Sequence, residues 1–323
     1  MNTHLANLSN QLMLGTVLLY VVALFGYAAD LAFGERRKAA EVAAKAEAKV
    51  LATAGAPAAA EPAEAVAEES GNEGKREIDW ARFSVMFTVL GWGVQLAEII
   101  TRGMAAGRIP WGNMYEFTSA ITFSAVTVFL IVLIRQPVRF LGAFLMVAVV
   151  IGLGVGTIWL YDDPGPVRPA LQSYWIAIHV TAAIIATGTF TVAAVTTLLY
   201  VFKARREAKT ADGRNSFLGR FPAADRLDQL SNKITMFGFP IWTFAIIAGA
   251  IWADQAWGSY WQWDPKETWS FITWVVYAGY LHARATAGWK GNKAAVISLL
   301  AFGCLLFNFF GINYLVSGMH SYA

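Results

Sequence analysis

The chain has 323 residues, of which 57% are hydrophobic and only 15% are charged. This composition excludes an ordinary soluble domain and indicates a polytopic membrane protein. The formal net charge of +3 says little by itself, because the positions of the charges matter more than their sum, and we expect no nucleic acid partner.

Eight segments are long and apolar enough to cross a membrane, which takes about 20 residues of helix. The first is too long for a removed signal peptide, and we read it as a retained anchor. We therefore predict an all-α polytopic membrane protein with about eight transmembrane helices, at roughly 11–33, 80–100, 117–134, 140–160, 172–202, 234–254, 268–285 and 294–316.

Residues 34–79 interrupt this pattern with a run of Ala, Glu, Lys and Pro. The first half, roughly 35–50, could form a short charged helix that projects from the first span. The remainder is typical of a flexible linker. The predicted organisation is an outer start with the first helix (1–33), a flexible cytoplasmic linker (34–79) and a seven-helix core (80–323).

The positions of Lys and Arg predict how the spans are oriented. With eight spans, 21 of the 25 cationic residues fall on one side of the membrane, which we take as the cytoplasmic side. The prediction places both termini on the extracytoplasmic side. The cations on that outer side are Arg102, Arg108, Arg168 and Lys266.

His179 lies about two turns into the fifth span, counted from its outer end. Imidazole is a common axial ligand of haem iron, and a histidine at an interface can equally be bonded to a neighbour. His320 follows the last span, on the same predicted side. His282 lies at the opposite end of the seventh span, about 20 Å of helix away from Trp269, and an ionisable group within a span is a functional candidate.

Between the sixth and seventh spans, residues 254–267 form a loop rich in aromatic residues on the outer side. It contains Trp257, Tyr260, Trp261 and Trp263, and ends in Asp264 and Pro265. Tryptophan and tyrosine gather at membrane interfaces in general, but such a belt does not require Gly, Asp and Pro at fixed places. Large flat side chains held in one loop can pack against a large flat ligand.

Cys304 is the only cysteine, which excludes a thiol–disulfide mechanism within the chain. The chain also lacks a Cys-x-x-Cys-His segment, so it is not itself a c-type cytochrome. A lone thiol inside an apolar span behaves as a small hydrophobic side chain.

The sequence WGSYWQWDPKE (residues 257–267) resembles the tryptophan-rich WWD motif of membrane haem-handling proteins used in cytochrome c maturation. Its Asp-Pro-Lys-Glu ending is most similar to the CcsA/ResC family of System II cytochrome c synthetase subunits, over roughly residues 80–323. The segment from Pro110 to Glu116 also resembles a signature of this family, and we expect it to support the outer site.

The resemblance implies that non-covalent haem b binds on the outer face, with His179 and His320 as axial ligands and Trp257, Tyr260, Trp261, Trp263 and Asp264 around it. Asp264 could touch the haem, but we expect it to cap or brace the loop. The family assigns the position of His282 to a second, intramembrane haem. Its other ligand comes from a partner subunit of the CcsB/ResB type.

The function that the resemblance implies is haem transport and covalent attachment of haem to apocytochrome c, as a subunit of a holocytochrome c synthase. No residue of this chain is expected to act as a nucleophile. The expected location is the plasma membrane, or the thylakoid membrane with a lumenal site in a plastid-type relative.

Two alternatives stay open. A System I haem-delivery protein of the CcmC or CcmF type shares the tryptophan motif but differs in span count or length. A small-molecule permease could use the tryptophan loop as an external gate, although such transporters often contain internal repeats, and none is evident here.

Overall fold

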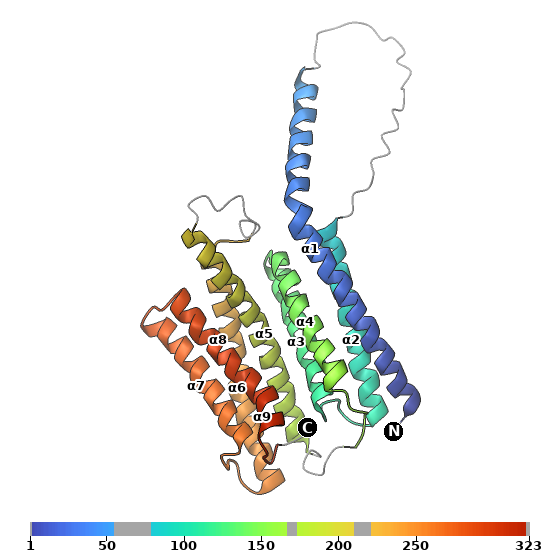
Figure 1. Ribbon diagram of the computed structural model, residues 1–323, viewed down its shortest axis with the longest axis vertical. Coiled ribbons are helices and arrows are strands. Elements are labelled where there is room, and N and C mark those ends of the chain that lie inside the picture. Colours follow the sequence, from blue (N-terminus) through green and yellow to red (C-terminus); the bar gives the residue numbers. More distant parts are fainter. Residues whose placement is uncertain (1, 55–78, 167–172, 210–220, 321–323) are drawn as a thin grey trace.

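The computed structural model describes residues 2–54, 79–166, 173–209 and 221–320 of the chain (Figure 1). All regular elements in these ranges are helical, which confirms the predicted all-α fold. The elements are α1 (Thr3–Ala54), α2 (Trp80–Ala106), α3 (Met114–Arg135), α4 (Arg139–Trp159), α5 (Tyr174–Lys209), α6 (Ala224–Trp257), α7 (Pro265–Thr286), α8 (Asn292–Leu306), the π-helical turn η4 (Phe307–Gly311) and α9 (Ile312–Leu315).

Each of the eight predicted spans coincides with a helix. Seven helices in the described part of the chain are long and apolar enough to cross a membrane, the last of them running from Asn292 to Leu315. The helix outside this set is α7, which has 22 residues but carries Lys266, Glu267, His282 and Arg284. The chain is therefore a polytopic membrane protein in which α7 is the least apolar of the long helices.

Helix α1 extends well beyond the apolar segment that begins it. Its 52 residues correspond to about 78 Å of helix, whereas the hydrocarbon layer is about 30 Å thick. The charged helix predicted at 35–50 is thus the continuation of α1. The rest of the predicted linker, residues 55–78, lies outside the described residues.

Local sequence signals define where the helices begin and end. Asp79, Asn113 and Asp264 are N-cap residues whose side chains accept hydrogen bonds from backbone N–H groups of the first turn. Gly107 and Gly258 follow α2 and α6 in the left-handed conformation, which glycine adopts without steric cost.

Glycines and buried polar groups join α1 to its neighbours. A Cβ atom at Gly91 of α2 would lie 2.6 Å from the ring of Tyr20, and one at Gly142 of α4 would lie 2.5 Å from the ring of Tyr27. The Tyr20 hydroxyl donates to Gln95 Oε1 over 2.8 Å, and Gln95 Nε2 donates to Thr122 of α3 over 3.0 Å. Hydrogen bonding satisfies these groups, which would otherwise be costly to bury.

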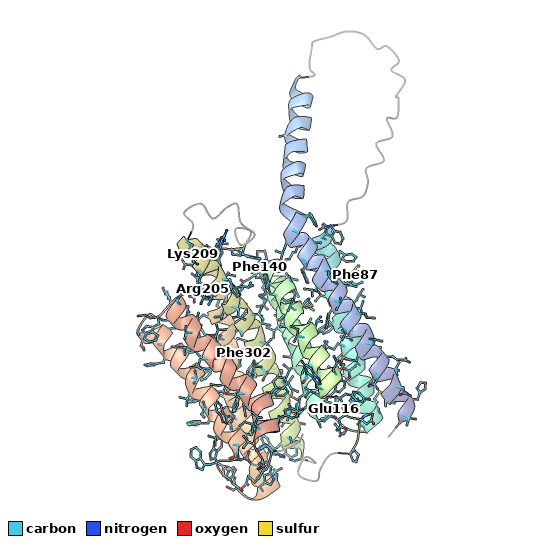
Figure 2. The ribbon with its side chains drawn as sticks, viewed as in Figure 1. Phe87, Glu116, Phe140, Arg205, Lys209 and Phe302 are labelled. Atoms are coloured by element: carbon cyan, nitrogen blue, oxygen red, sulfur yellow. The ribbon has the colours of Figure 1, made fainter. Side chains whose placement is uncertain are left out.

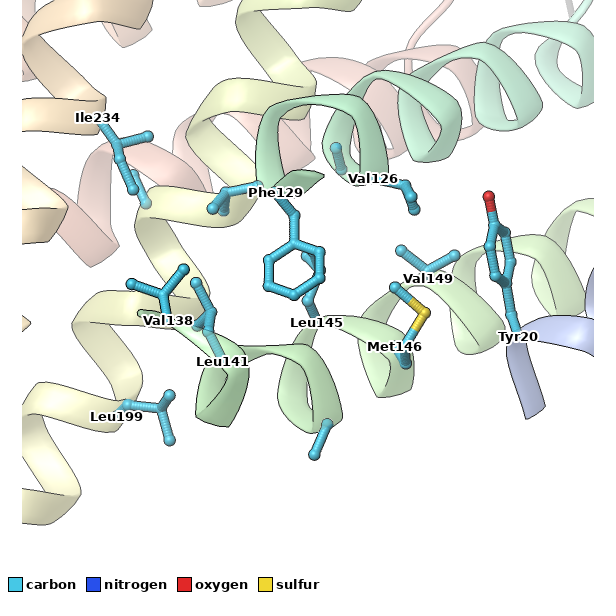
Figure 3. Packing of buried hydrophobic residues seen from close by; sticks show 14 of the residues in the cluster. Tyr20, Val126, Phe129, Val138, Leu141, Leu145, Met146, Val149, Leu199 and Ile234 are labelled. Atoms are coloured by element: carbon cyan, nitrogen blue, oxygen red, sulfur yellow. The ribbon is translucent and has the colours of Figure 1, made fainter. Parts of the chain in front are cut away.

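The main hydrophobic core lies where α3, α4 and α5 meet. Phe129 of α3 is fully buried with Leu141 and Leu145 of α4, and Leu199 of α5 belongs to the same cluster (Figure 3). Apolar side chains on the outside of the bundle, such as Ile134 and Ile151, are exposed in the isolated chain. This is the surface expected to face lipid.

Both marked ends of the chain and the connection between α6 and α7 lie at the same end of the bundle (Figure 1). At this end the backbone N–H of Asn2 donates to Ala105 O over 3.2 Å. Figure 2 places Glu116 toward the same end, and Arg205 and Lys209 toward the opposite one. The fold therefore brings the tryptophan-rich loop and the segment that carries His320 together.

Candidate functional site

His179 is a half-buried side chain in the second turn of α5, held against α6. Its Nδ1 lies 2.7 Å from the carbonyl oxygen of Ala245. Because a carbonyl only accepts hydrogen bonds, Nδ1 carries the proton and Nε2 carries the lone pair. Gly249 leaves room for the ring, since a Cβ atom there would lie 2.7 Å from Nδ1.

His320 reaches the same end of the bundle from the segment after α9. Its Nδ1 lies 2.8 Å from Asp264 Oδ1. Burial raises the pKa of Asp264, but hydrogen bonds from His320 and from the backbone of Met319 outweigh it, so the pKa of Asp264 lies below its usual value. An ionised carboxylate only accepts, so Nδ1 of His320 carries the proton of this hydrogen bond.

The two histidines line one cavity among α3, α5, α6, α7 and α8. Trp252 of α6 packs near both rings: its centroid is 6.2 Å from that of His179, nearly parallel, and 5.6 Å from that of His320. Most of the remaining wall is apolar and includes Trp111, Phe117, Ile121, Ile176, Val180, Ile184, Trp242, Leu305 and Phe309. This lining suits a large apolar ligand.

Four buried polar atoms of cavity residues have no hydrogen-bond partner in the described structure. Two are donors, the indole nitrogens of Trp111 and Trp242, and two are acceptors, on Glu267 and Asn308. Asn308 belongs to the π-helical turn that ends α8, and such turns are frequent at functional sites. Buried polar atoms are usually satisfied, so these are positions where a ligand or water would gain hydrogen bonds.

The structure distinguishes the outer cations that the sequence left equivalent. Arg102 and Arg108 both bind the buried carboxylate of Glu116, with the shortest Arg108 contact at 2.7 Å. Glu116 also accepts from the backbone of Gly112, which lines the cavity. The Pro110–Glu116 segment is therefore a brace for the site. Arg168 lies outside the described residues.

Lys266, which is also predicted to lie on the outer side, lines the cavity. Its Nζ donates to Asn313 Oδ1 over 2.8 Å, which ties the first turn of α7 to α9. An ammonium group at this position can also form charge-assisted hydrogen bonds to a carboxylate of a ligand.

Only some of the site residues predicted in the tryptophan-rich loop line the cavity. Helix α6 continues to Trp257, so the loop proper is 258–264 rather than 254–267. Tyr260 and Trp261 line the cavity, and the Trp257 ring packs edge-on against His320 at 4.7 Å. Trp263 has φ of 59° and is 68% exposed. Asp264 holds His320 and caps α7 through a capping box with Glu267, which confirms the predicted capping role.

His282 is remote from this cavity. It lies in the last turns of α7, its side chain is exposed, and it does not line the cavity that contains His179 and His320. The structure therefore groups the first two candidate ligands and separates the third, as the sequence predicts.

Sequence reasoning missed Trp242, Trp252 and Gly249. The first two lie inside an apolar span, where an aromatic residue gives no signal of its own. Their spacing from Trp257 could have drawn attention, since residues 252 and 257 are little more than one helical turn apart. The need for glycine at 249 depends on the neighbouring helix and is not visible in the sequence.

The donor set fits haem better than a bare metal ion. No group of three or more His, Cys, Asp or Glu side chains in the described ranges could hold a metal ion. Two imidazoles with fixed Nδ1 protons suit an iron whose four other ligands come from a porphyrin. The aromatic wall and Lys266 suit the porphyrin faces and its carboxylates.

Fold and site together define a polytopic membrane protein with a two-histidine, tryptophan-lined cavity at one end of its helical bundle. Residues 111–320 match the cytochrome C assembly protein family. This chain belongs to that family, and it is a CcsA-like cytochrome c biogenesis protein.

Two relatives illustrate the similarity. "Cytochrome c biogenesis protein CcsA" of Trieres chinensis is 34% identical over 250 residues, covering 69% of this chain and 80% of that protein. The protein of the same name from a Synechocystis species is 33% identical over 276 residues, covering 68% and 82%.

Among solved structures, "Cytochrome c Heme Lyase CcmF" has a similar fold, with a TM-score of 0.64. The match covers 99% of this chain but only 48% of that chain, at 14% identity. The likeness extends to the fold alone.

Proposed function

We propose that this protein holds non-covalent haem b between His179 and His320 and presents it for covalent attachment to apocytochrome c. The observation that carries the proposal is that two histidines 141 positions apart in the sequence line one cavity, each with Nδ1 bonded to an acceptor. Membership of the cytochrome c assembly family and the apolar, aromatic walls add support.

Within this proposal the residues have separate tasks. His179 and His320 would hold the iron, and the rings of Trp252, Tyr260 and Trp261 would contact the porphyrin. Lys266 and the indole N–H groups of Trp111 and Trp242 would donate hydrogen bonds to the propionate carboxylates of the haem.

The chemistry of attachment is an addition that needs no nucleophile from this chain. When bound, haem supplies two vinyl groups. Each thiol of a substrate Cys-x-x-Cys-His segment adds across one of them, so that a carbon–sulfur bond forms and the thiol hydrogen goes to the other vinyl carbon. Holding the reactants in register can contribute about 7–11 kcal/mol, and we assign the chain this positioning role in a holocytochrome c synthase.

We further propose a separate membrane partner of the CcsB/ResB type. His282 is exposed on α7, so a second subunit could cover it and supply the other ligand of an intramembrane haem. The proposed orientation places the cavity and both termini on the extracytoplasmic face of the plasma membrane, or on the lumenal face of a thylakoid.

The test is the absorbance spectrum of the full chain, purified with and without its partner. We expect a b-type haem spectrum with low-spin character, reduced by His179→Ala or His320→Ala and restored by added imidazole. A colourless wild-type protein that takes up no added haem would refute the proposal and favour a permease. Maturation is then measured as covalent haem on a co-expressed apocytochrome c.

A further inference from the structure

A single carboxylate, that of Asp264, joins three parts of the site. Its Oδ1 accepts from His320 Nδ1 at 2.8 Å and from the backbone N–H of Lys266 at 3.1 Å. Its Oδ2 accepts from the backbone N–H of Met319 at 2.8 Å. The start of α7, the segment after α9 and the ring of His320 therefore all depend on one side chain.

The segment after α9 lies directly on this carboxylate. A Cβ atom at Gly318 would be 2.6 Å from Asp264 Oδ2 and 3.3 Å from Pro265 Cδ. Glycine is therefore required at this position for the close approach, whereas its φ is not in the left-handed region. Regular helix ends at Leu315, so no helix positions His320 as α5 positions His179.

The two histidines thus have different supports. His179 belongs to a long helix, and its Nδ1 faces the neutral carbonyl of Ala245. His320 belongs to a non-helical segment, and its Nδ1 faces a buried carboxylate. A carboxylate partner fixes the tautomer of a metal-binding imidazole and makes it a stronger donor to the metal.

We infer that Asp264 is the positioning residue for His320. It anchors the segment that carries the ring and holds the proton on Nδ1, so that Nε2 is the nitrogen offered to iron. This inference rests on the proposed haem site and deepens it, because it makes one of the two proposed iron ligands dependent on a residue that need not touch the haem.

Asp264 also caps α7, so the test must separate capping from positioning. Asparagine is as good an N-cap as aspartate and has nearly the same shape, so Asp264→Asn preserves the helix start. The amide, however, offers one acceptor oxygen and one NH₂ donor, whereas Met319 N–H and His320 Nδ1–H require two acceptors. With the amide oxygen kept in the capping position of Oδ1, the NH₂ group faces the N–H of Met319, so the segment that carries His320 loses its anchor.

The experiment is a haem titration of the full chain in detergent or nanodiscs, with its partner present, followed by absorbance and electron paramagnetic resonance. For Asp264→Asn we expect haem affinity to fall about 10- to 100-fold and the bound haem to lose low-spin, six-coordinate character. Added imidazole should restore the low-spin spectrum. Gly318→Ala, which leaves the carboxylate intact but displaces the segment, should give the same spectral change.

Asp254→Asn is the matched control. Asp254 lies in the last turn of α6 at the same end of the bundle, and it is not among the residues that line the cavity. This variant should bind haem as the wild type does.

The outcomes separate the two proposals. If His320→Ala loses low-spin haem but Asp264→Asn and Gly318→Ala keep wild-type affinity and spectrum, Asp264 is only a helix cap and the positioning role is refuted. If the wild type binds no haem, or His320→Ala leaves its spectrum unchanged, the proposed function itself fails.

Discussion

Substituting Gly249 with alanine should weaken the haem site by displacing His179, although residue 249 bears no functional group. The added Cβ would lie 2.7 Å from His179 Nδ1 and 2.8 Å from Cε1. Real Cβ contacts of this length are essentially absent, so the ring must move by several tenths of an ångström. It cannot move without stretching its 2.7 Å hydrogen bond to Ala245 O.

The cost can be assembled from two effects. Overpacking a well-packed interior costs about 1–3 kcal/mol, and a lost hydrogen bond about 1 kcal/mol more. Because the imidazole is the proposed ligand, a displaced ring should lower haem affinity about 10- to 100-fold, as for other changes next to a metal ligand.

The assay is haem titration of the purified variant, compared with Gly303→Ala in α8. A Cβ atom at Gly303 meets nothing within 4 Å, so this control should bind haem normally and be as stable as the wild type. Wild-type affinity and an unchanged low-spin spectrum for Gly249→Ala would show that His179 does not need its present position, and would refute the reasoning.

Three further predictions concern the brace, the topology and the second haem. Glu116→Gln should lower the free energy of unfolding in detergent by about 3–5 kcal/mol, because it removes the carboxylate that pairs with the buried guanidinium of Arg102. The melting temperature should therefore fall, and an unchanged value would contradict this prediction. Labelling of single cysteines placed in the 258–264 loop and at Asn2 should occur from the outside of intact cells, and labelling only after lysis would overturn the orientation. His282→Ala, with the partner present, should lower the yield of holocytochrome c while leaving haem binding at the His179–His320 site intact; full yield would make His282 an ordinary interfacial residue.

The sequence predicted the helices well because a long run of apolar residues by itself indicates a membrane-spanning helix. Its errors lie where helices continue into polar sequence. The predicted apolar span starts near residue 234 because Asp225, Arg226 and Asp228 are charged. Helix α6 nevertheless begins at Ala224, and Asp228 forms an ion pair with Arg284 of α7. Pro240 lies inside α6 without ending it.

The sequence predicted which histidines belong to the candidate site, but not how the side chains around them are arranged. Cation positions predicted a common side of the membrane for His179 and His320, which was enough to group them. The direction of each loop side chain could not be deduced, and Trp263 is exposed although Trp261, two positions earlier, lines the cavity. The contact between Asp264 and His320 depends on how a non-helical segment folds back, which no local periodicity encodes.

The π-helical turn at Phe307–Gly311 has a consequence for the register of everything that follows it. A π turn accommodates one residue more than an α turn, so the residues after it keep the phase they would have in a continuous α-helix that is one residue shorter. If the turn relaxed to α geometry with all its residues kept, the chain beyond it would rotate by about 100°. Asn313, which accepts the hydrogen bond from Lys266, would then point away from α7. The π turn therefore keeps Asn313 directed at α7, and we expect the loss of one residue to be tolerated better within this turn than within α8, where the same loss would rotate everything downstream by about 100°.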